Sequence, residues 1–410
     1  MWLPALALLL ILTLSVWPML VAAEGQFNLH VAQAGAWLHG RTDVPPGADV
    51  AAFNGRNYVS FPPFPSLLVL PVVAMAGVPA TNTVLIALLL SALNIALLLL
   101  ICRAWQVDLH IALWASAGFI LGSAYWQAVF NSGGVWNFSH VVSVTCGLAA
   151  IYAAKRTGLG LPAGLFVGLS FLTRQLTIFL AIFVMMVLWQ HPRSGTRSSR
   201  WVQLALFSTV IAICVAAYLG YNTLRFSDPL QTGYAFMPLS GFLKERFDHY
   251  GLFNLHYLPF NLYYLLLAGF ELTFAPPAYL HPPGLNPFGT SITFASPFIF
   301  TAFMARGNRL LLLAAWISIA LIFTPQLFYY NNGWMQYNAQ RFTLDAWPAL
   351  FVLIVLGAQH TARLPNPQPA LSLDLRPDSR NEVPRRLWRA AILFAIALNA
   401  ITWAILTKVI

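Results

Sequence analysis

The chain has 410 residues, of which 59% are hydrophobic and only 8% are charged. About a quarter of the residues of an average soluble domain are charged, so this composition excludes an ordinary soluble globular protein. The formal net charge of +10 would suit a protein that binds nucleic acid. It has another explanation once the basic residues are placed on a membrane topology.

A bilayer of ~30 Å hydrocarbon thickness is crossed by about 20 apolar residues in a helix. Apolar segments that approach or exceed this length occur at 2–22, 81–102, 109–124, 138–154, 161–173, 176–190, 201–221, 292–305, 309–327, 343–360 and 387–407. We therefore predict an all-α polytopic membrane protein with about eleven transmembrane helices.

The first apolar segment allows two interpretations. The "VAA" before Glu24 resembles a signal-peptidase site, as in a cleaved signal peptide. The charged n-region is missing, however, and the apolar run is longer than a usual signal-peptide core. A retained first helix with a cytoplasmic N-terminus is therefore favoured.

This topology places most basic residues on one side of the membrane. The cytoplasmic set is Arg103, Lys155, Arg156, Arg193, Arg197, Arg200, Arg306, Arg309, Arg363, Arg376, Arg380, Arg385, Arg386 and Arg389. Such a bias is what the positive-inside rule requires, so we expect the bilayer as the partner and no nucleic acid. The arrangement predicts a domain over 1–363, a cytoplasmic linker over 364–386 and a C-terminal helix over 387–410.

Polar residues gather on the opposite side, in the outer loops 23–80 and 222–291 and in "YYNNGWMQYNAQR". The first loop is predicted to contain an interfacial helix, because four apolar residues recur at helical spacing: Phe27, Val31, Ala34 and Leu38. Asn28 and Gln33 lie off this stripe.

The stretch Phe53–Pro71, "FNGRNYVSFPPFPSLLVLP", combines polar residues, prolines and an apolar run. If it crossed the membrane, every later loop would change sides. We predict that it dips into the outer leaflet and lines a cavity, where irregular backbone is tolerated.

Arg174 stands alone between two apolar runs. An ionisable residue at membrane depth is a candidate functional group, while snorkelling to the headgroups from a short turn is the alternative. For Arg341 and Asp345, the alternative to a functional role is an ion pair within one helix, since they are four residues apart.

Glu24, His140 and Glu271 are further candidates with ordinary explanations beside them. Glu24 would equally serve as a helix-capping acid, and His140 lies among aromatic residues typical of a membrane interface. Glu271 is an isolated acid beside apolar residues and prolines. The three cysteines, which all lie in apolar segments, are expected to be small buried side chains without a disulfide: Cys102, Cys146 and Cys214.

Several segments, in order along residues 1–360, resemble one family of membrane enzymes. They include "AEGQFNLHVAQAGAWLHGRTDV", "DVAAFNGRNYVSFPPFPSLLVLP", "GLPAGLFVGLSFLTRQ", "YNTLRFSDPLQTGYAF" and "YNNGWMQYNAQRFTLDAWPALFVL". Together they resemble the GT-C class of glycosyltransferases, in the branch of protein O-mannosyltransferases and lipid A aminoarabinose transferases, family 39. The sequence departs from the family pattern at Glu24, where an aspartate is usual, at Ser227-Asp228 and before Arg341.

The resemblance implies a GT-C-like helical bundle in a bacterial inner membrane, with an extracytoplasmic site. It implies transfer of a hexose or pentose from a polyprenyl-phosphate donor to a lipid, glycan or protein acceptor, with inversion. By position, Glu24 would be the base, and Arg174, Arg341 and Arg56 would bind the donor phosphate. The substrate cavity would include Asn54, Tyr58, Pro62, Pro63, His140 and Glu271. No metal or other cofactor is expected.

Other functions remain open at this point. A transporter or flippase of lipid-linked saccharides would also need many helices and buried arginines, but it should show inverted repeats and broken helices near the bilayer midplane. A non-catalytic GT-C relative, or another membrane enzyme that uses lipid-linked sugars, is the remaining alternative.

Overall fold

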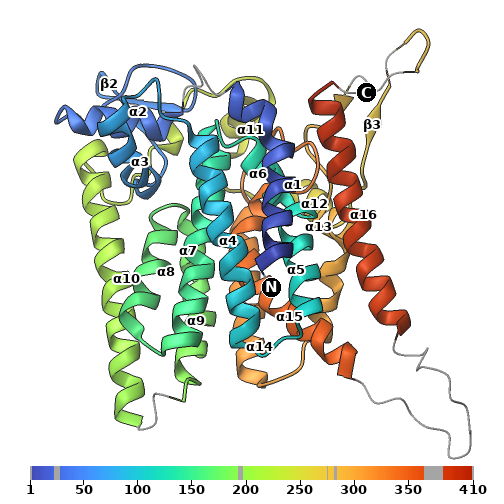
Figure 1. Cartoon of the computed structure of the whole chain (residues 1–410). Coiled ribbons are helices and arrows are strands. Elements are labelled where there is room, and N and C mark those ends of the chain that lie inside the picture. Colours follow the sequence, from blue (N-terminus) through green and yellow to red (C-terminus); the bar gives the residue numbers. More distant parts are fainter. Residues whose placement is uncertain are drawn as a thin grey trace, which may run out of the picture.

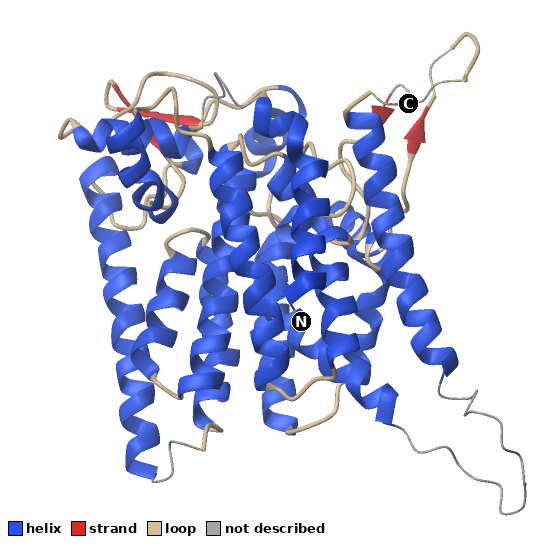
Figure 2. Ribbon diagram, in the orientation of Figure 1, coloured by secondary structure: helices blue, strands red, loops and turns tan. Residues whose placement is uncertain are grey.

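The computed structural model describes residues 2–22, 28–192, 197–274, 276–280, 284–363 and 382–408. They form a helical bundle whose upper end carries a layer of short helices and hairpins (Figures 1 and 2). The bundle consists of α1 (Trp2–Val21), α4 (Thr83–Ala104), α5 (Leu109–Leu121), α6 (Ala124–Phe130), α7 (Val135–Thr157), α8 (Gly160–Phe171), η1 (Gln175–Phe179), α9 (Leu180–Trp189), α10 (Arg197–Phe226), α13 (Ile292–Ala295), η4 (Pro297–Met304), α14 (Arg309–Leu327), η5 (Arg341–Asp345), α15 (Trp347–Arg363) and α16 (Glu382–Leu406).

The outer loops supply the remaining elements. They are α2 (Leu29–Leu38), β1 (Val50–Phe53), β2 (Arg56–Val59), α3 (Phe64–Ala76), η2 (Tyr234–Phe236), α11 (Gly241–Tyr250), η3 (Leu255–Tyr257), α12 (Leu258–Leu266), β3 (Leu272–Thr273) and β4 (Gly284–Leu285). The strands form two antiparallel hairpins, β1–β2 and β3–β4. Figure 1 shows α2, α3 and α11 at the upper end, the end that we expect to be extracytoplasmic.

The prediction of an all-α polytopic membrane protein is confirmed. Among the described residues, six helices are long and apolar enough to cross a membrane: α1, α4, α7, α10, α14 and α16. A bent pair, α5 and α6, supplies a seventh span if it is counted as one. The pair turns by 51° at Gly122 and Ser123, where the Ser123 hydroxyl accepts a hydrogen bond from Tyr125 N and so starts a new helix.

Every apolar segment predicted from the sequence is helical, but several are too short for a full crossing. They include α8, the η1–α9 unit and α15. About eleven transmembrane helices are expected from the sequence, whereas among the described residues six or seven spans have full length. In Figure 1, α8 and α9 form a hairpin whose tip lies directly beneath the outer layer.

Glycines allow α8 to pack closely against α10. Gly160, Gly164 and Gly168 recur every four residues and face that helix. A Cβ atom on Gly164 would lie 2.5 Å from the Phe207 carbonyl oxygen, and one on Gly160 would lie 1.8 Å from the Gln203 carbonyl oxygen. Small residues at this spacing let two membrane helices approach to backbone contact.

The N-terminal segment packs into the bundle as a helix. One face of α1 is buried, with Leu12 and Val16 at 0% exposure. Two tryptophans from distant helices donate hydrogen bonds to Ser15: Trp126 Nε1 to its hydroxyl at 2.9 Å and Trp403 Nε1 to its carbonyl at 2.6 Å. These contacts attach α1 to the rest of the bundle.

The helix of the first outer loop is more buried than predicted. The helix α2 is not half-exposed at an interface, because Asn28 and Gln33 are buried while Leu38 is 46% exposed. Its second face is covered by α3 and by the start of α4, where Asn28 Nδ2 donates to Thr83 Oγ1 at 3.3 Å. Polar residues off an apolar stripe therefore make buried hydrogen bonds here.

The stretch Phe53–Pro71 forms the end of a β-hairpin and the start of α3. Asn54 and Gly55 occupy the hairpin turn, both with positive φ (49° and 74°). An Asn-Gly pair of this kind is typical of the tight turn that matches strand twist. The helix that it begins, α3, has 13 residues and is too short for a full crossing, and of the stretch only Phe61 lines the cavity described below.

Helix ends at the lower end of the bundle carry part of the predicted cytoplasmic charge. At this end α4, α7, α9, η4 and α15 finish and α5, α8, α10, α14 and α16 begin (Figure 1). Arg103, Lys155, Arg309 and Arg385 all lie at these helix ends. The bundle thus separates a basic lower end from an upper end that is rich in polar loops.

Candidate functional site

A cavity of about 360 Å³ lies between the outer layer and the upper half of the bundle. Its walls are largely aromatic and include Phe61, Trp136, Tyr234, Tyr329, Trp334 and Phe342. Four charged residues also line it: Asp49, Arg174, Arg341 and Asp345. Apolar pockets with a few convergent polar groups are the usual form of a small-molecule site.

Arg174 and Asp345 form a buried ion pair at the cavity wall. Arg174 Nε donates to Asp345 Oδ1 at 2.6 Å, although the two residues are 171 positions apart in the chain. The Asp345 side chain is 1% exposed, and that of Arg174 keeps 19% exposure. His140 Nδ1 lies 3.3 Å from the same carboxylate oxygen, without the alignment of a hydrogen bond.

The tip of the α8–α9 hairpin holds Arg174 in this position. The Phe64 amide of α3 donates to the Leu172 carbonyl at 2.9 Å, and Gln175 Nε2 donates to the Tyr218 hydroxyl of α10 at 2.9 Å. The tip is thus fixed from above and from the side. Arg174 does not snorkel to the headgroups, because its guanidinium points to a buried carboxylate below the outer layer.

Arg341 is buried and makes no salt bridge in the described part of the chain, although Asp49 lies nearby. It is 3% exposed; Nη1 donates to the Trp334 carbonyl at 3.2 Å, and Nε has no hydrogen-bond partner there. Its guanidinium carbon lies 5.4 Å from the Trp136 ring centre and 5.5 Å from that of Phe342. Arg174 approaches the same Phe342 ring, at 5.3 Å.

The ion pair between Arg341 and Asp345 that their spacing allowed does not form. Residues 341–345 adopt a 3₁₀ helix, in which three residues make a turn and residues four apart point in different directions. Asp345 therefore pairs with Arg174, and the guanidinium of Arg341 faces the cavity without a salt bridge to Asp345.

Asp49 adds a carboxylate to which the sequence patterns did not point. It precedes β1 in the first outer loop and has a positive φ of 61°, a conformation that aspartate tolerates better than most residues. Burial raises the pKa of Asp49 to about 6, and the nearby positive charge of Arg341 acts in the opposite direction. The group is thus poised to titrate close to neutral pH.

Four predicted site residues lie beside the cavity or outside the described residues. Glu24, the predicted base, lies outside the described residues. His140 is fully buried behind Asp345 rather than at the cavity surface. Pro62 and Pro63 are buried in the turn before α3, next to the lining residue Phe61.

The other predicted residues lie away from the cavity. Asn54 and Arg56 are exposed in and beside the β-hairpin turn. The Tyr58 ring packs edge-on against Phe226 of α10, at 5.5 Å between centres, and so attaches the hairpin to the bundle. Glu271 is exposed and accepts a hydrogen bond from Asn286 at 2.7 Å. Their roles in substrate binding remain predictions without support from this geometry.

No protein-family model matches the sequence, and no curated protein matches it. The fold, however, is similar to that of ArnT from Cupriavidus metallidurans. The crystal structure of ArnT bound to undecaprenyl phosphate matches 98% of this chain and 75% of that chain, at 15% identity and a TM-score of 0.51. The apo structure of the same protein matches 96% and 74%, at 16% identity and a TM-score of 0.47.

The likeness extends over nearly the whole chain, but at this identity it concerns the fold. ArnT is the aminoarabinose transferase of the branch that the sequence segments resemble. The predicted resemblance to the GT-C class is therefore confirmed at the level of the fold, and the chain is an integral membrane protein with an ArnT-like architecture.

Proposed function

We propose that this protein is a membrane glycosyltransferase. It transfers a sugar from a polyprenyl-phosphate donor to an acceptor at the extracytoplasmic face, and the anomeric centre is inverted. The observation that carries the proposal is the pair of arginines in one aromatic cavity, of which Arg341 makes no salt bridge in the described part of the chain. The shared fold with a protein crystallised with undecaprenyl phosphate supports it.

The two arginines of the cavity favour the binding of a phosphate group. Guanidinium groups bind phosphate through two parallel hydrogen bonds and stabilise negative charge. Asp345 orients Arg174 and offsets its charge, whereas Arg341 makes no salt bridge in the described part of the chain: Asp49 is near it but not paired with it, so an anion could contact its guanidinium directly. The aromatic walls suit the apolar carrier and the face of a sugar ring.

The reaction that we propose is a single displacement. The acceptor hydroxyl oxygen forms a bond to the anomeric carbon as the bond from that carbon to the phosphate oxygen breaks. Polyprenyl phosphate leaves with the electron pair, and Arg174 and Arg341 stabilise the charge that develops on it. The hydroxyl proton passes to a carboxylate.

Two carboxylates are candidates for that base. Glu24 is predicted from the family resemblance, and Asp49 lies in the cavity with its pKa raised to about 6 by burial. A general base is most effective when its pKa lies near the working pH, which favours Asp49 among the described residues. The substitutions Glu24→Gln and Asp49→Asn distinguish the two.

The experiment is transfer from radiolabelled polyprenyl-phosphate sugars to a membrane extract by the purified protein and its variants. We expect turnover in the wild type and loss of about 100-fold or more when the true base is replaced. Loss is also expected for Arg174→Gln. Binding of the donor without turnover would support a non-catalytic relative, and transport of the intact donor across liposomes would support a flippase.

The orientation is tested separately. Single cysteines at Asn54, in the exposed hairpin turn, and at Arg309, at the lower end, should react with an impermeant reagent from opposite sides of the membrane. Extracytoplasmic labelling of the cysteine at position 54 alone agrees with the proposal. Labelling of both from one side would contradict the topology on which the proposed face depends.

A further inference from the structure

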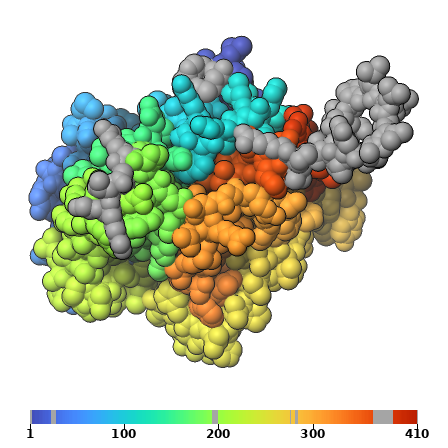
Figure 3. All heavy atoms as spheres, turned by 90° about the horizontal axis from the view of Figure 1, so that it is seen from below, coloured from blue at the N-terminus to red at the C-terminus, as the bar shows by residue number. Residues whose placement is uncertain are grey.

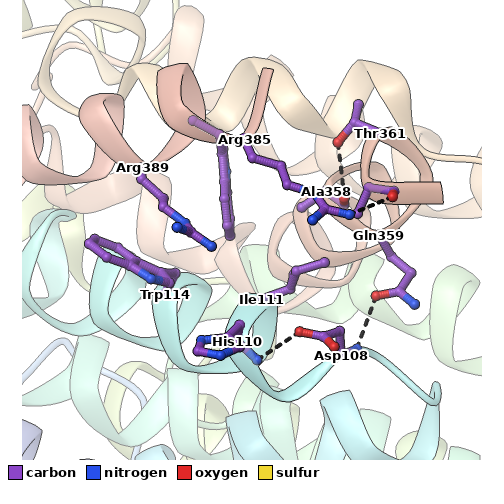
Figure 4. A pocket seen from close by; sticks show the side chains of 11 residues that line it. Asp108, His110, Ile111, Trp114, Ala358, Gln359, Thr361, Arg385 and Arg389 are labelled. Carbon is purple, nitrogen blue, oxygen red and sulfur yellow. Dashed lines mark hydrogen bonds between the residues drawn. The ribbon is translucent and has the colours of Figure 1, made fainter. Parts of the chain in front are cut away.

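A second pocket, of about 380 Å³, lies at the opposite end of the molecule from the cavity. It is formed where α5 begins, α15 ends and α16 begins, and its residues are shown in Figure 4. Figure 3, the view from below, shows the surface of the α5 region beside the surfaces of α15 and α16. We expect these helix ends to lie at the level of the headgroups of the lower leaflet.

The pocket presents hydrogen-bond donors from one face of α16. Arg385, Trp388 and Arg389 follow each other at the three- and four-residue spacing that places side chains on one side of a helix. Figure 4 shows Arg385 and Arg389 reaching from α16 toward α15 and α5. The Arg389 guanidinium carbon lies 5.7 Å from the Trp114 ring centre.

Trp388 supplies an observation that points to a ligand. The residue is only 9% exposed, yet its Nε1 has no hydrogen-bond partner in the described part of the chain. A buried indole N–H usually finds an acceptor. An anion in the pocket would supply one.

Asp108 is the only acid among the described residues that line this pocket. The carboxylate of Asp108 accepts a hydrogen bond from the His110 amide at 2.8 Å and thereby caps the first turn of α5. Arg385 donates to the Ala362 carbonyl at 2.5 Å, so it also holds the start of α16 against the end of α15. The described lining residues thus carry two arginines against one aspartate, which is an excess of positive charge.

We propose that this pocket binds the phosphate headgroup of an anionic phospholipid from the inner leaflet. Arginines at the ends of membrane helices, with tryptophans at the same level, are typical of basic pockets that bind lipid headgroups on the cytoplasmic side. Ile111 and Trp114 form an apolar wall beside the donors. The lipid would brace α16, which lies at the edge of the bundle in Figure 1, against α5 and α15.

The test uses the delipidated full-length protein in detergent. The melting temperature is measured during separate titrations with phosphatidylglycerol, phosphatidylcholine and inorganic phosphate, and native mass spectrometry counts the bound lipid. We expect phosphatidylglycerol to stabilise the protein more than the other two. Arg389→Gln should weaken phosphatidylglycerol binding by about tenfold or more, because it removes a charge-assisted contact.

Three further variants make the result specific. Trp388→Phe removes the unpartnered N–H and should also weaken binding, which keeps the proposal testable if Arg389→Gln folds poorly. Arg309→Gln removes an exposed charge at the same end outside the pocket and should have no effect. Arg341→Gln should leave phosphatidylglycerol binding intact, because it lies in the upper cavity.

Equal loss in Arg309→Gln would attribute the effect to general surface charge, and loss in Arg341→Gln would assign it to the upper cavity. Either result overturns the proposal. Stabilisation by inorganic phosphate equal to that by phosphatidylglycerol would make the ligand a soluble anion and exclude a lipid-specific site. No preference for phosphatidylglycerol over phosphatidylcholine would also overturn it.

Discussion

Replacing Arg341 by glutamine should change ligand binding much more than it changes stability. The substitution removes one charged hydrogen bond, at 3.2 Å, and two aromatic contacts. These losses cost about 1.5–3 kcal/mol and about 1–2 kcal/mol respectively. The removal of a buried charge that makes no salt bridge in the described chain returns several kcal/mol. The free energy of unfolding of the ligand-free protein should therefore change by less than about 2 kcal/mol.

The same substitution should only weaken the binding of undecaprenyl phosphate. A phosphate that loses one of its two arginines gives up charge-assisted hydrogen bonds worth about 2–3 kcal/mol. Since each 1.4 kcal/mol is a factor of ten, the Kd for undecaprenyl phosphate should rise by about 30- to 150-fold. Titration calorimetry in detergent measures the Kd, and a thermal melt of the same sample measures stability.

Arg225 offers a matched control, because it is a buried arginine outside the cavity. It is 2% exposed, donates to the Val59 carbonyl and to Asn222 Oδ1, and lies over the Tyr221 ring at 4.1 Å. Arg225→Gln should lower the melting temperature and leave the Kd of the folded protein unchanged. If Arg341→Gln instead behaves in the same way as Arg225→Gln, Arg341 is structural and the reasoning fails.

Other substitutions test the remaining parts of the site. If Asp49 is the base, kcat/KM should fall tenfold per pH unit below about pH 6, since protonation through its raised pKa removes the acceptor, and a pH–rate profile of Asp49→Asn should lack this acidic limb. Asp345→Asn should lower the free energy of unfolding by about 3 kcal/mol, because it leaves Arg174 without its buried partner; an unchanged denaturation midpoint would contradict the ion pair. Gly164→Ala should reduce the melting temperature and the yield of folded protein, because its Cβ would meet the Phe207 backbone, whereas Gly220→Ala, in open space on α10, should be tolerated.

The sequence is informative where a charged residue stands among apolar neighbours. Arg174 stands between two apolar runs, and a charge at such depth is costly, so the sequence alone marks it as a candidate. Its partner could not be predicted, because Asp345 is 171 residues away and four-residue spacing pointed to Arg341 instead. A short 3₁₀ helix, which has no clear sequence signal, decided the pairing.

Asp49 and the first outer loop show a different limit. Asp49 lies in a polar loop where an acid is unexceptional, and only the burial of its side chain in the cavity raises its pKa, against the opposing effect of Arg341. Asn54 and Gly55 did carry a local signal, since an Asn-Gly pair between alternating residues is typical of a hairpin. The family resemblance drew attention to a lipid-sugar site there instead, and the structure places the turn in solvent.

The depth of the charged site follows from helix length and glycine packing. With 12 residues, α8 is about 18 Å long, which is well short of the ~30 Å hydrocarbon core. Close contact between its glycines and α10 fixes it at that level, and α3 closes over the tip through the hydrogen bond from Phe64 to Leu172. An arginine at a tip that reached the surface would extend into the headgroups. Because this tip stays below the outer layer, Arg174 needs Asp345 as a partner, and together they form the charged wall of a cavity that the outer loops cover.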